Sequence, residues 1–247
     1  MQGPQSSHPG DELLRSLNEA QRQAVLHFEG PALVVAGAGS GKTRTVVHRV
    51  AYLIAKRGVF PSEILAVTFT NKAALEMRER LKRMVKGAGE LWVATFHSAA
   101  LRILRVYGER VGLRPGFVVY DEDDQAALIR EVLKELGLSA RPGPIKGLLD
   151  RAKNRGEAPE SLLPELPEYY AGLSRGKLLD VVKRYEEALR AQGALDFGDI
   201  LLYALRLLKE DQEVLKRVRR RARFIHVDEY QDTNPVQYRF TRLLAGE

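Results

Sequence analysis

The sequence ALVVAGAGSGKTRTVV, residues 32–47, joins an apolar run to a glycine-rich turn and then to a helical pattern. We predict a buried strand over residues 32–36 and a helix over residues 42–57. Glycines in the turn let the backbone curl without Cβ clashes, so its N–H groups can face inward at the start of the helix. This order of strand, loop and helix predicts a phosphate-binding loop in an α/β fold.

The side chains of this loop have separate predicted roles. Lys42 can reach the β- and γ-phosphates of a nucleotide, and the Thr43 hydroxyl can bind Mg²⁺. Ala36 replaces the first glycine of the usual pattern, at a position that shapes the turn and carries no phosphate chemistry. A glycine-rich turn with a chance Lys-Thr pair is the alternative interpretation. The predicted cradle comprises Ala38, Gly39, Ser40, Gly41, Lys42 and Thr43.

Further apolar runs alternate with helical patterns along the chain. We predict strands over residues 64–69, 91–96 and 224–229, with helices over 71–86, 97–110 and 235–244. Strands that alternate with helices favour a parallel, doubly wound sheet. The last strand, FIHVDE, is predicted to belong to the same sheet.

The pattern changes between residues 111 and 223, where helices predominate. We predict a short strand over 117–120 and helices over 121–137, 144–155, 174–192, 196–210 and 211–222. In the segment IKGLLDRAKNRG, residues 145–156, we expect Lys146, Lys153 and Arg155 to lie mostly outside. We expect the arginine-rich run at 217–224 to be a solvated helix end.

Two acids, Asp228 and Glu229, follow the apolar run FIHV directly. In phosphate-loop enzymes an acid at this place holds Mg²⁺, and a neighbouring glutamate can activate the attacking water. Adjacent residues at a strand end point to different sides, so the two acids can have two roles. A solvated turn after an edge strand is the alternative, and the presence of the phosphate loop disfavours it.

Composition limits the remaining possibilities. The 247 residues contain 45% hydrophobic residues, no cysteine and five histidines without metal-ligand spacing. We therefore expect a folded cytoplasmic protein with neither disulfides nor structural zinc. The longest apolar runs are too short to span a bilayer, so no membrane partner is expected. A net charge of +7 favours a polyanionic partner.

Six motifs occur in order and together resemble the leading motifs of the UvrD/PcrA/Rep DNA helicases of superfamily 1. They are LNEAQRQAV (17–25), AGAGSGKTRTVV (36–47), LAVTFTNKAALEMRER (65–80), ATFHSAALRIL (94–104), ALDFGDIL (194–201) and VDEYQDTN (227–234). The resemblance implies a RecA-like motor domain with a parallel sheet, 1A, over residues 1–94 and 211–247, with a flexible tail over 1–12. It also implies a mostly helical inserted domain, 1B, over residues 95–210.

The resemblance also implies roles for individual residues. Gln21 is similar to the glutamine that recognises adenine, and Arg44 to the arginine that packs on the adenine face; Lys42, Asp228 and Glu229 are implied to be catalytic. The residues implied to contact single-stranded DNA are Phe69, Thr70, Asn71, Lys72, Thr95 and His97. A ring at a strand end can stack on a base; the alternative interpretations are a core ring for Phe69 and a helix cap for Thr70 or Asn71.

The implied activity is ATP- and Mg²⁺-dependent DNA helicase action in the 3′ to 5′ direction on single-stranded DNA and single–double-strand junctions, with DNA-repair proteins as possible partners. In this family, arginine fingers and the segment GDxxQSIYxFRGA complete the ATP site, and we expect this chain to be the part that precedes them. The alternatives are a non-catalytic binding fragment, a small-molecule kinase and an RNA helicase. In ALDFGDIL, Gly198 stands where aspartate is common, so Asp196 and Asp199 receive no predicted role.

Overall fold

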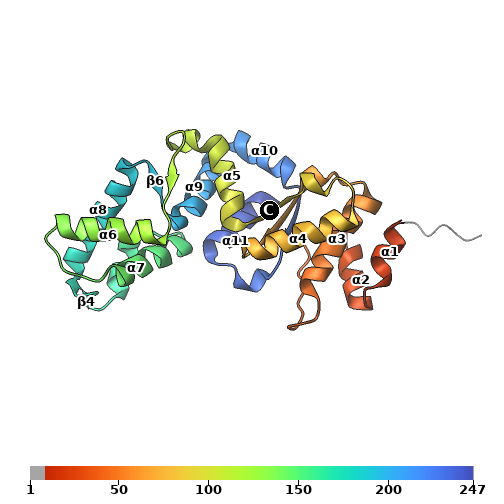
Figure 1. Ribbon diagram of the computed structural model, residues 1–247, viewed down its shortest axis with the longest axis horizontal. Coiled ribbons are helices and arrows are strands. Elements are labelled where there is room, and N and C mark those ends of the chain that lie inside the picture. Colours follow the sequence, from red (N-terminus) through yellow and green to blue (C-terminus); the bar gives the residue numbers. More distant parts are fainter. Residues whose placement is uncertain (1–8, 247) are drawn as a thin grey trace, which may run out of the picture. The chain divides into compact units, whose positions relative to one another are not determined.

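The computed structural model describes residues 9–246, which form two compact units (Figure 1). The first unit contains the residues up to Phe96 together with Arg217–Asp232. The second contains His97–Lys216 and the residues from Thr233 onward. No helix of the described residues is both long enough and apolar enough to cross a membrane.

The first unit is built on a three-stranded parallel sheet. Its strands are β1 (Ile64–Thr68), β2 (Trp92–Thr95) and β7 (Phe224–Val227), in the order β2-β1-β7. Every residue of β1 and β2 is buried, which explains why both strands are continuous apolar runs. The parallel sheet and the membership of its last strand were both predicted and are confirmed.

The helices of the first unit stack beside this sheet. Helix α4 (Asn71–Met84) packs against the sheet, α3 (Lys42–Arg57) packs on α4, and α1 (Pro9–Arg15) and α2 (Glu19–Leu26) pack on α3. The 3₁₀ turns η1 (Pro61–Glu63), η2 (Ala88–Glu90) and η5 (Tyr230–Asp232) join the elements. The core combines Val50 of α3 and Leu81 of α4 with Ile64 of β1. Thr70 caps α4 by accepting a hydrogen bond from the Ala73 N–H at 3.1 Å. The predicted helix over 42–57 is confirmed at both ends.

The predicted strand over residues 32–36 is wrong. Residues 32–36 form no strand, and Leu33, Val34 and Val35 are 73%, 49% and 86% exposed. An apolar run becomes a buried strand only beside a ladder partner, and no described strand pairs with these residues. The flexible tail predicted over 1–12 stays a prediction; α1 begins at Pro9 and packs on α3. Residues 1–8 lie outside the described part of the chain.

The second unit is mostly helical. Its helices are α5 (Phe96–Tyr107), α6 (Glu122–Glu135), α7 (Pro142–Arg155), α8 (Arg175–Ala191), α9 (Phe197–Glu210) and α11 (Pro235–Ala245), with 3₁₀ turns η3 (Gly108–Val111) and η4 (Pro159–Glu165). α10 (Gln212–Arg221) runs across the boundary of the two units. The α6, α7 and α8 helices share one core, and Figure 1 shows them gathered together.

Short strands complete this unit. β3 (Val118–Val119) pairs in parallel with β6 (Ala194–Leu195), and β4 (Tyr169–Tyr170) pairs antiparallel with β5 (Leu173–Ser174). The C-terminal helix α11 packs on α9 and α7, within the second compact unit. The compact units therefore divide the chain differently from the predicted domains, whose boundaries stay a prediction.

A buried cluster of charges joins three helices of the second unit. Lys153 of α7 lies 2.6 Å from Asp196, 2.8 Å from Asp199 and 2.9 Å from Glu186. The expectation that Lys153 lies outside is wrong, because its side chain is 2% exposed and its charge is compensated there. Tyr185 donates a hydrogen bond to Asp196 at 2.9 Å. Asp196 and Asp199, which had no predicted role, thus serve the fold of this unit.

Gly198 is required beside this cluster. A Cβ at Gly198 would lie 2.7 Å from the Lys153 Cβ, which is closer than real side chains approach. An aspartate side chain at this position would therefore collide with the Lys153 stem. Glycine at position 198 therefore leaves the space that the buried Lys153 side chain occupies.

The three carboxylates compete for one ammonium group. Burial is the largest influence on the Asp199 carboxyl; Lys153 opposes it, Asp196 reinforces it, and the pKa of Asp199 rises to about 7. Burial would lower the pKa of Lys153, but the charges of Asp199, Asp196 and Glu186 outweigh it and raise that pKa. The cluster therefore retains a proton on Asp199 near neutral pH.

Asp199 is expected to make stability depend on pH. The folded protein keeps the Asp199 proton up to about pH 7, whereas the unfolded chain releases it near pH 3.8. The Asp199 contribution to the free energy of unfolding should fall as pH rises from about 4 to 7, by up to about 1.4 kcal/mol per pH unit. Urea unfolding of the parent and of Asp199→Asn between pH 4 and 8 measures this. A pH-independent difference between the two proteins would contradict it.

Candidate nucleotide and DNA sites

The glycine-rich loop adopts backbone angles that only glycine takes easily. Gly39 and Gly41 have φ values of +74° and +86°, in the left-handed region. Gly41 is also the N-cap of α3, and a Cβ there would lie 2.9 Å from the Gln21 side-chain nitrogen. The loop therefore leads directly into the N-terminus of a 16-residue helix, where backbone N–H groups and the helix dipole favour an anion.

Lys42 is folded back over this loop. Its Nζ donates to the carbonyl oxygens of Ala36 and Gly37 at 3.3 Å each and lies 4.0 Å from a Glu229 carboxylate oxygen. The side chain is about one-quarter exposed, at 23%. Carbonyl oxygens are weaker partners for an ammonium group than phosphate oxygens, so Lys42 can exchange them for an anionic ligand.

Thr43 and Asp228 come together from positions 185 residues apart. The Thr43 hydroxyl donates to the Asp228 carboxylate at 2.7 Å, and Asp228 is 6% exposed. The Asp228 N–H donates to the Val67 carbonyl at 3.0 Å, which continues the β1–β7 ladder and fixes the acid at the end of β7. A hydroxyl and a carboxylate are hard oxygen donors of the kind Mg²⁺ takes, so this pair fits the predicted metal.

Glu229 has an unusual backbone conformation. Its φ is +54°, a left-handed angle that is uncommon outside glycine and costs of order 1–3 kcal/mol when surrounding structure enforces it. Its carboxylate accepts a hydrogen bond from the Gln231 side chain and lies 4.0 Å from Lys42. The Glu229 side chain is 40% exposed. The carboxylate is accessible to solvent, whereas the neighbouring Asp228 is buried, so the two acids occupy different environments.

Gln21 and Arg44 are both tied to backbone carbonyls in this region. Gln21 belongs to a capping box with Asn18, and its side-chain nitrogen donates to the Ser40 carbonyl at 2.8 Å. Arg44 donates to the Ser16 carbonyl at 2.9 Å. Gln21 thus supports the loop conformation, a structural role that its sequence motif did not reveal.

A buried histidine lies two residues before Asp228. Burial and, to a smaller extent, the charge of Arg49 lower the pKa of His226 to about 3, so the imidazole is neutral at neutral pH. Its Nδ1 has no hydrogen-bond partner within the described residues. The pattern of five histidines gave no indication of this environment.

Five predicted DNA-contacting residues lie at the carboxyl ends of β1 and β2: Phe69, Thr70, Asn71, Lys72 and Thr95. The Phe69 ring is half-buried and packs edge-on against Phe96, with centroids 5.5 Å apart. The residues at 70–72 are exposed at the start of α4, whereas Thr95 is 8% exposed. The structure therefore brings five of the six residues to one edge of the sheet.

His97, the sixth residue, belongs to the second compact unit. Its ring packs on Phe197, with centroids 4.7 Å apart, and burial lowers its pKa. Phe197 is 55% exposed at the start of α9 and was absent from the predicted site. An aromatic ring directly after a helix cap, within the motif ALDFGDIL, was the available sequence signal.

Comparison with known proteins identifies the family. Residues 17–247 match the UvrD/REP helicase N-terminal domain, and the chain therefore belongs to the UvrD/REP helicase family. The chain is 42% identical to the ATP-dependent DNA helicase PcrA of Bacillus subtilis over 95% of its length and 32% of that protein. It is 44% identical to the ATP-dependent DNA helicase UvrD1 of Mycobacterium bovis over 98% and 32%, respectively. The chain thus spans about one-third of the length of these relatives.

Proposed function

We propose that this chain forms the ATP-binding part of a 3′ to 5′ DNA helicase, with a RecA-like motor domain and an inserted helical domain. The observation that carries the proposal is the 2.7 Å hydrogen bond between Thr43 and Asp228. It unites the phosphate-type loop with an acid from a distant strand, which is the arrangement that Mg²⁺-dependent nucleotide chemistry needs. The names of the relatives, ATP-dependent DNA helicases, support the same conclusion.

Each residue near the loop has a proposed role. The loop N–H groups and Lys42 bind the phosphates, and Thr43 and Asp228 hold Mg²⁺, which would neutralise phosphate charge. Glu229 accepts the proton of the attacking water, since its carboxylate is accessible while Asp228 is not. Gln21 and Arg44 contact the adenine after exchanging their present carbonyl partners.

Single-stranded DNA is the proposed polymer substrate. The exposed residues at 70–72 supply polar contacts to phosphates at the start of α4, and the half-buried Phe69 ring offers a face to a base. His97 and Phe197 provide a second aromatic surface in the other unit. Action at single–double-strand junctions and association with repair proteins belong to this proposal.

ATP turnover by the 247-residue chain is proposed to be slow. The side chains that contact the two acids are Thr43 at Asp228, and Lys42 and Gln231 at Glu229. An arginine at the transferring phosphate accelerates such reactions by roughly 10³–10⁵. The family resemblance implies that this arginine comes from a second motor domain, so nucleotide binding should far exceed turnover here.

Removing one predicted metal ligand tests the site. Asp228→Asn should abolish the preference of the chain for ATP with Mg²⁺ over ATP with EDTA, because it removes one negative charge from the metal site. Isothermal titration with both nucleotide forms measures this preference. Asp232→Asn, an equal charge change at an exposed residue of η5, is the control and should retain the preference. A parent protein that binds ATP equally well with and without Mg²⁺ would overturn the proposal.

A further inference from the structure

Basic side chains gather at the end of α10. Between Val214 and Val227 the sequence has six lysines and arginines and no acid. Val214, Leu215 and Val218 are buried, so α10 presents an apolar face inward. Three arginines, at positions i, i+3 and i+4 of the helix, are exposed: Arg217, Arg220 and Arg221.

These three arginines are grouped in the second half of α10. None of them makes a hydrogen bond or ion pair with any described residue. By contrast, Arg184 pairs with Glu135 at 2.8 Å and Arg206 with Glu210 at 2.9 Å. The helix dipole favours cations in a last turn, and the neighbouring acids Glu213 and Glu63 pair with Lys216 and Arg223 rather than with these three arginines.

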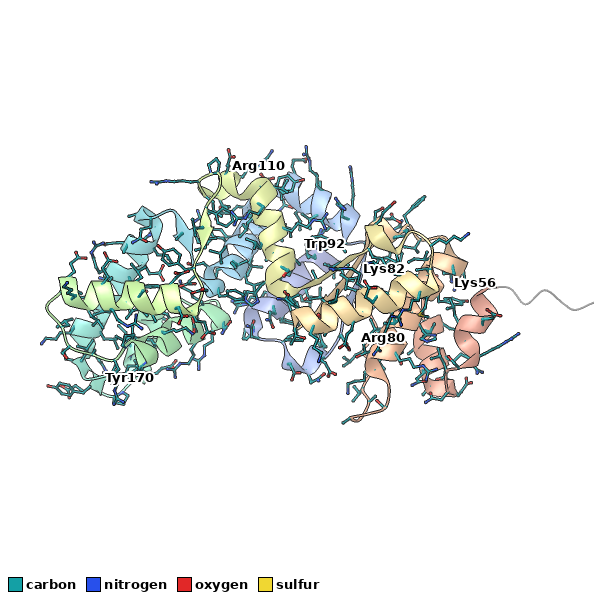
Figure 2. The ribbon with its side chains drawn as sticks, viewed as in Figure 1. Lys56, Arg80, Lys82, Trp92, Arg110 and Tyr170 are labelled. Atoms are coloured by element: carbon teal, nitrogen blue, oxygen red, sulfur yellow. The ribbon has the colours of Figure 1, made fainter. Side chains whose placement is uncertain are left out.

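The arginines lie at the amino edge of the sheet, away from the proposed nucleotide site. α10 leads into the amino end of β7, and Asp228 follows its carboxyl end. Because all three strands are parallel, α3 and α4 also end at the amino edge, before β1 and β2. Both have basic last turns; Figure 2 labels Lys56 of α3 and Lys82 of α4.

Aromatic rings and arginine side chains contact one another at the same edge of the sheet. The Arg223 guanidinium lies 5.5 Å from the centre of the Phe224 ring, and the Phe224 and Phe28 centroids are 6.0 Å apart. Arg57 lies over the other ring, Phe28, at 4.5 Å. Two aromatic rings therefore lie in a continuous series between two guanidinium groups at this edge.

An exposed aromatic ring adjoins this series. Phe60 is 69% exposed, and its backbone N–H donates to the Glu63 carboxylate at 3.3 Å. The other oxygen of Glu63 accepts from Arg223 at 3.4 Å. One carboxylate therefore connects Phe60 to the arginine cluster. We name the whole surface the amino-edge patch: Arg57, Phe60, Arg217, Arg220, Arg221 and Arg223.

We propose that the amino-edge patch binds a second segment of single-stranded DNA, separately from the predicted DNA residues at the carboxyl edge. This inference takes its DNA substrate from the proposed function. Guanidinium groups match phosphate oxygens bidentately and stack on bases, and an exposed phenylalanine supplies a further stacking face. Duplex DNA would present its phosphates but leave Phe60 without a base to contact.

Equilibrium binding of fluorescein-labelled oligo-dT to the 247-residue chain tests the patch. Arg217→Gln, Arg220→Gln and Arg221→Gln together should weaken binding at least tenfold in 50 mM salt. They should also reduce the slope of log affinity against log salt by about 2, at about 0.7 per lost phosphate contact. Phe60→Ala should weaken binding roughly fivefold or more. All four residues are exposed, so circular dichroism should show unchanged folding.

A matched triple variant controls for net charge. Arg155→Gln, Arg184→Gln and Arg206→Gln remove three charges from ion-paired arginines and should change the affinity less than twofold. Equal weakening by both triple variants would overturn the proposal. So would tighter binding of a duplex of the same length through the patch, or displacement of oligo-dT by poly-glutamate at matched charge.

Phe69→Ala separates this proposal from the proposed function. Loss of binding in the arginine variant with no change in Phe69→Ala supports the patch and refutes the proposed carboxyl-edge contact. The reverse result overturns the patch and leaves the proposed function intact. Independent losses in both variants, with two short oligonucleotides bound per parent chain, support both.

Discussion

Lys42→Ala is expected to lower the affinity of the chain for Mg²⁺·ATP by roughly 10- to 100-fold, the range for loss of a charge-assisted hydrogen bond to phosphate. The folded state should be little affected, because Lys42 has only 3.3 Å contacts to two loop carbonyls and lies 4.0 Å from Glu229. Isothermal titration measures the affinity, and thermal unfolding without nucleotide measures the stability.

Lys82→Ala is the matched control for this prediction. It removes the same charge from an exposed lysine of α4 that pairs with Glu79 at 2.8 Å, away from the loop. Its Mg²⁺·ATP affinity should equal that of the parent. If both variants bind Mg²⁺·ATP as the parent does, then Lys42 does not contact phosphate and the proposed nucleotide site is wrong.

Lys153→Met is expected to destabilise the protein by about 3–5 kcal/mol, the usual cost of leaving buried charges without their partner. Asp196, Asp199 and Glu186 would lose their shared cation, which lies within 2.9 Å of each. The loss should be smaller at pH 5 than at pH 8, because a protonated Asp199 leaves less uncompensated charge. Urea unfolding at both pH values measures the effect.

Lys146→Met provides the control on the same helix. Lys146 is 22% exposed and pairs with Asp150 at 3.0 Å, near the surface. Such pairs contribute about 0–1 kcal/mol, so this variant should remain close to the parent. Equal destabilisation by the two substitutions would show that the buried cluster contributes no more to the free energy of unfolding than an ion pair near the surface.

Local patterns predicted much of the first unit correctly. The helix over 42–57 and the three strands of the sheet have periodicities and glycine boundaries that the sequence displays directly. The apolar run at 32–36 resembled these strands, yet its residues are exposed. Burial of a strand depends on what lies beside it, and a local pattern contains no information about that partner.

Long-range contacts explain the other differences. Lys153 looked like an exposed lysine because its carboxylate partners lie 33 to 46 residues further along the chain. The bond from Gln21 to the Ser40 carbonyl spans 19 residues, so only the structure reveals it, and the role of Gln21 in adenine recognition stays a prediction. By contrast, the glycine-rich loop around Lys42 and the acids at Asp228 match motifs that are characteristic of phosphate and metal binding. Their proximity could therefore be predicted from the sequence.

The most direct test of the proposed nucleotide site is steady-state ATP hydrolysis by the 247-residue chain, with and without oligo-dT. Lys42→Ala is the blank, and Mg²⁺·ATP binding is measured in parallel. Detectable binding with turnover close to the blank is the predicted result, because the proposed function assigns the arginine that acts on the transferring phosphate to a second motor domain. Robust turnover stimulated by oligo-dT would contradict the proposal that an arginine from a second motor domain must complete the site.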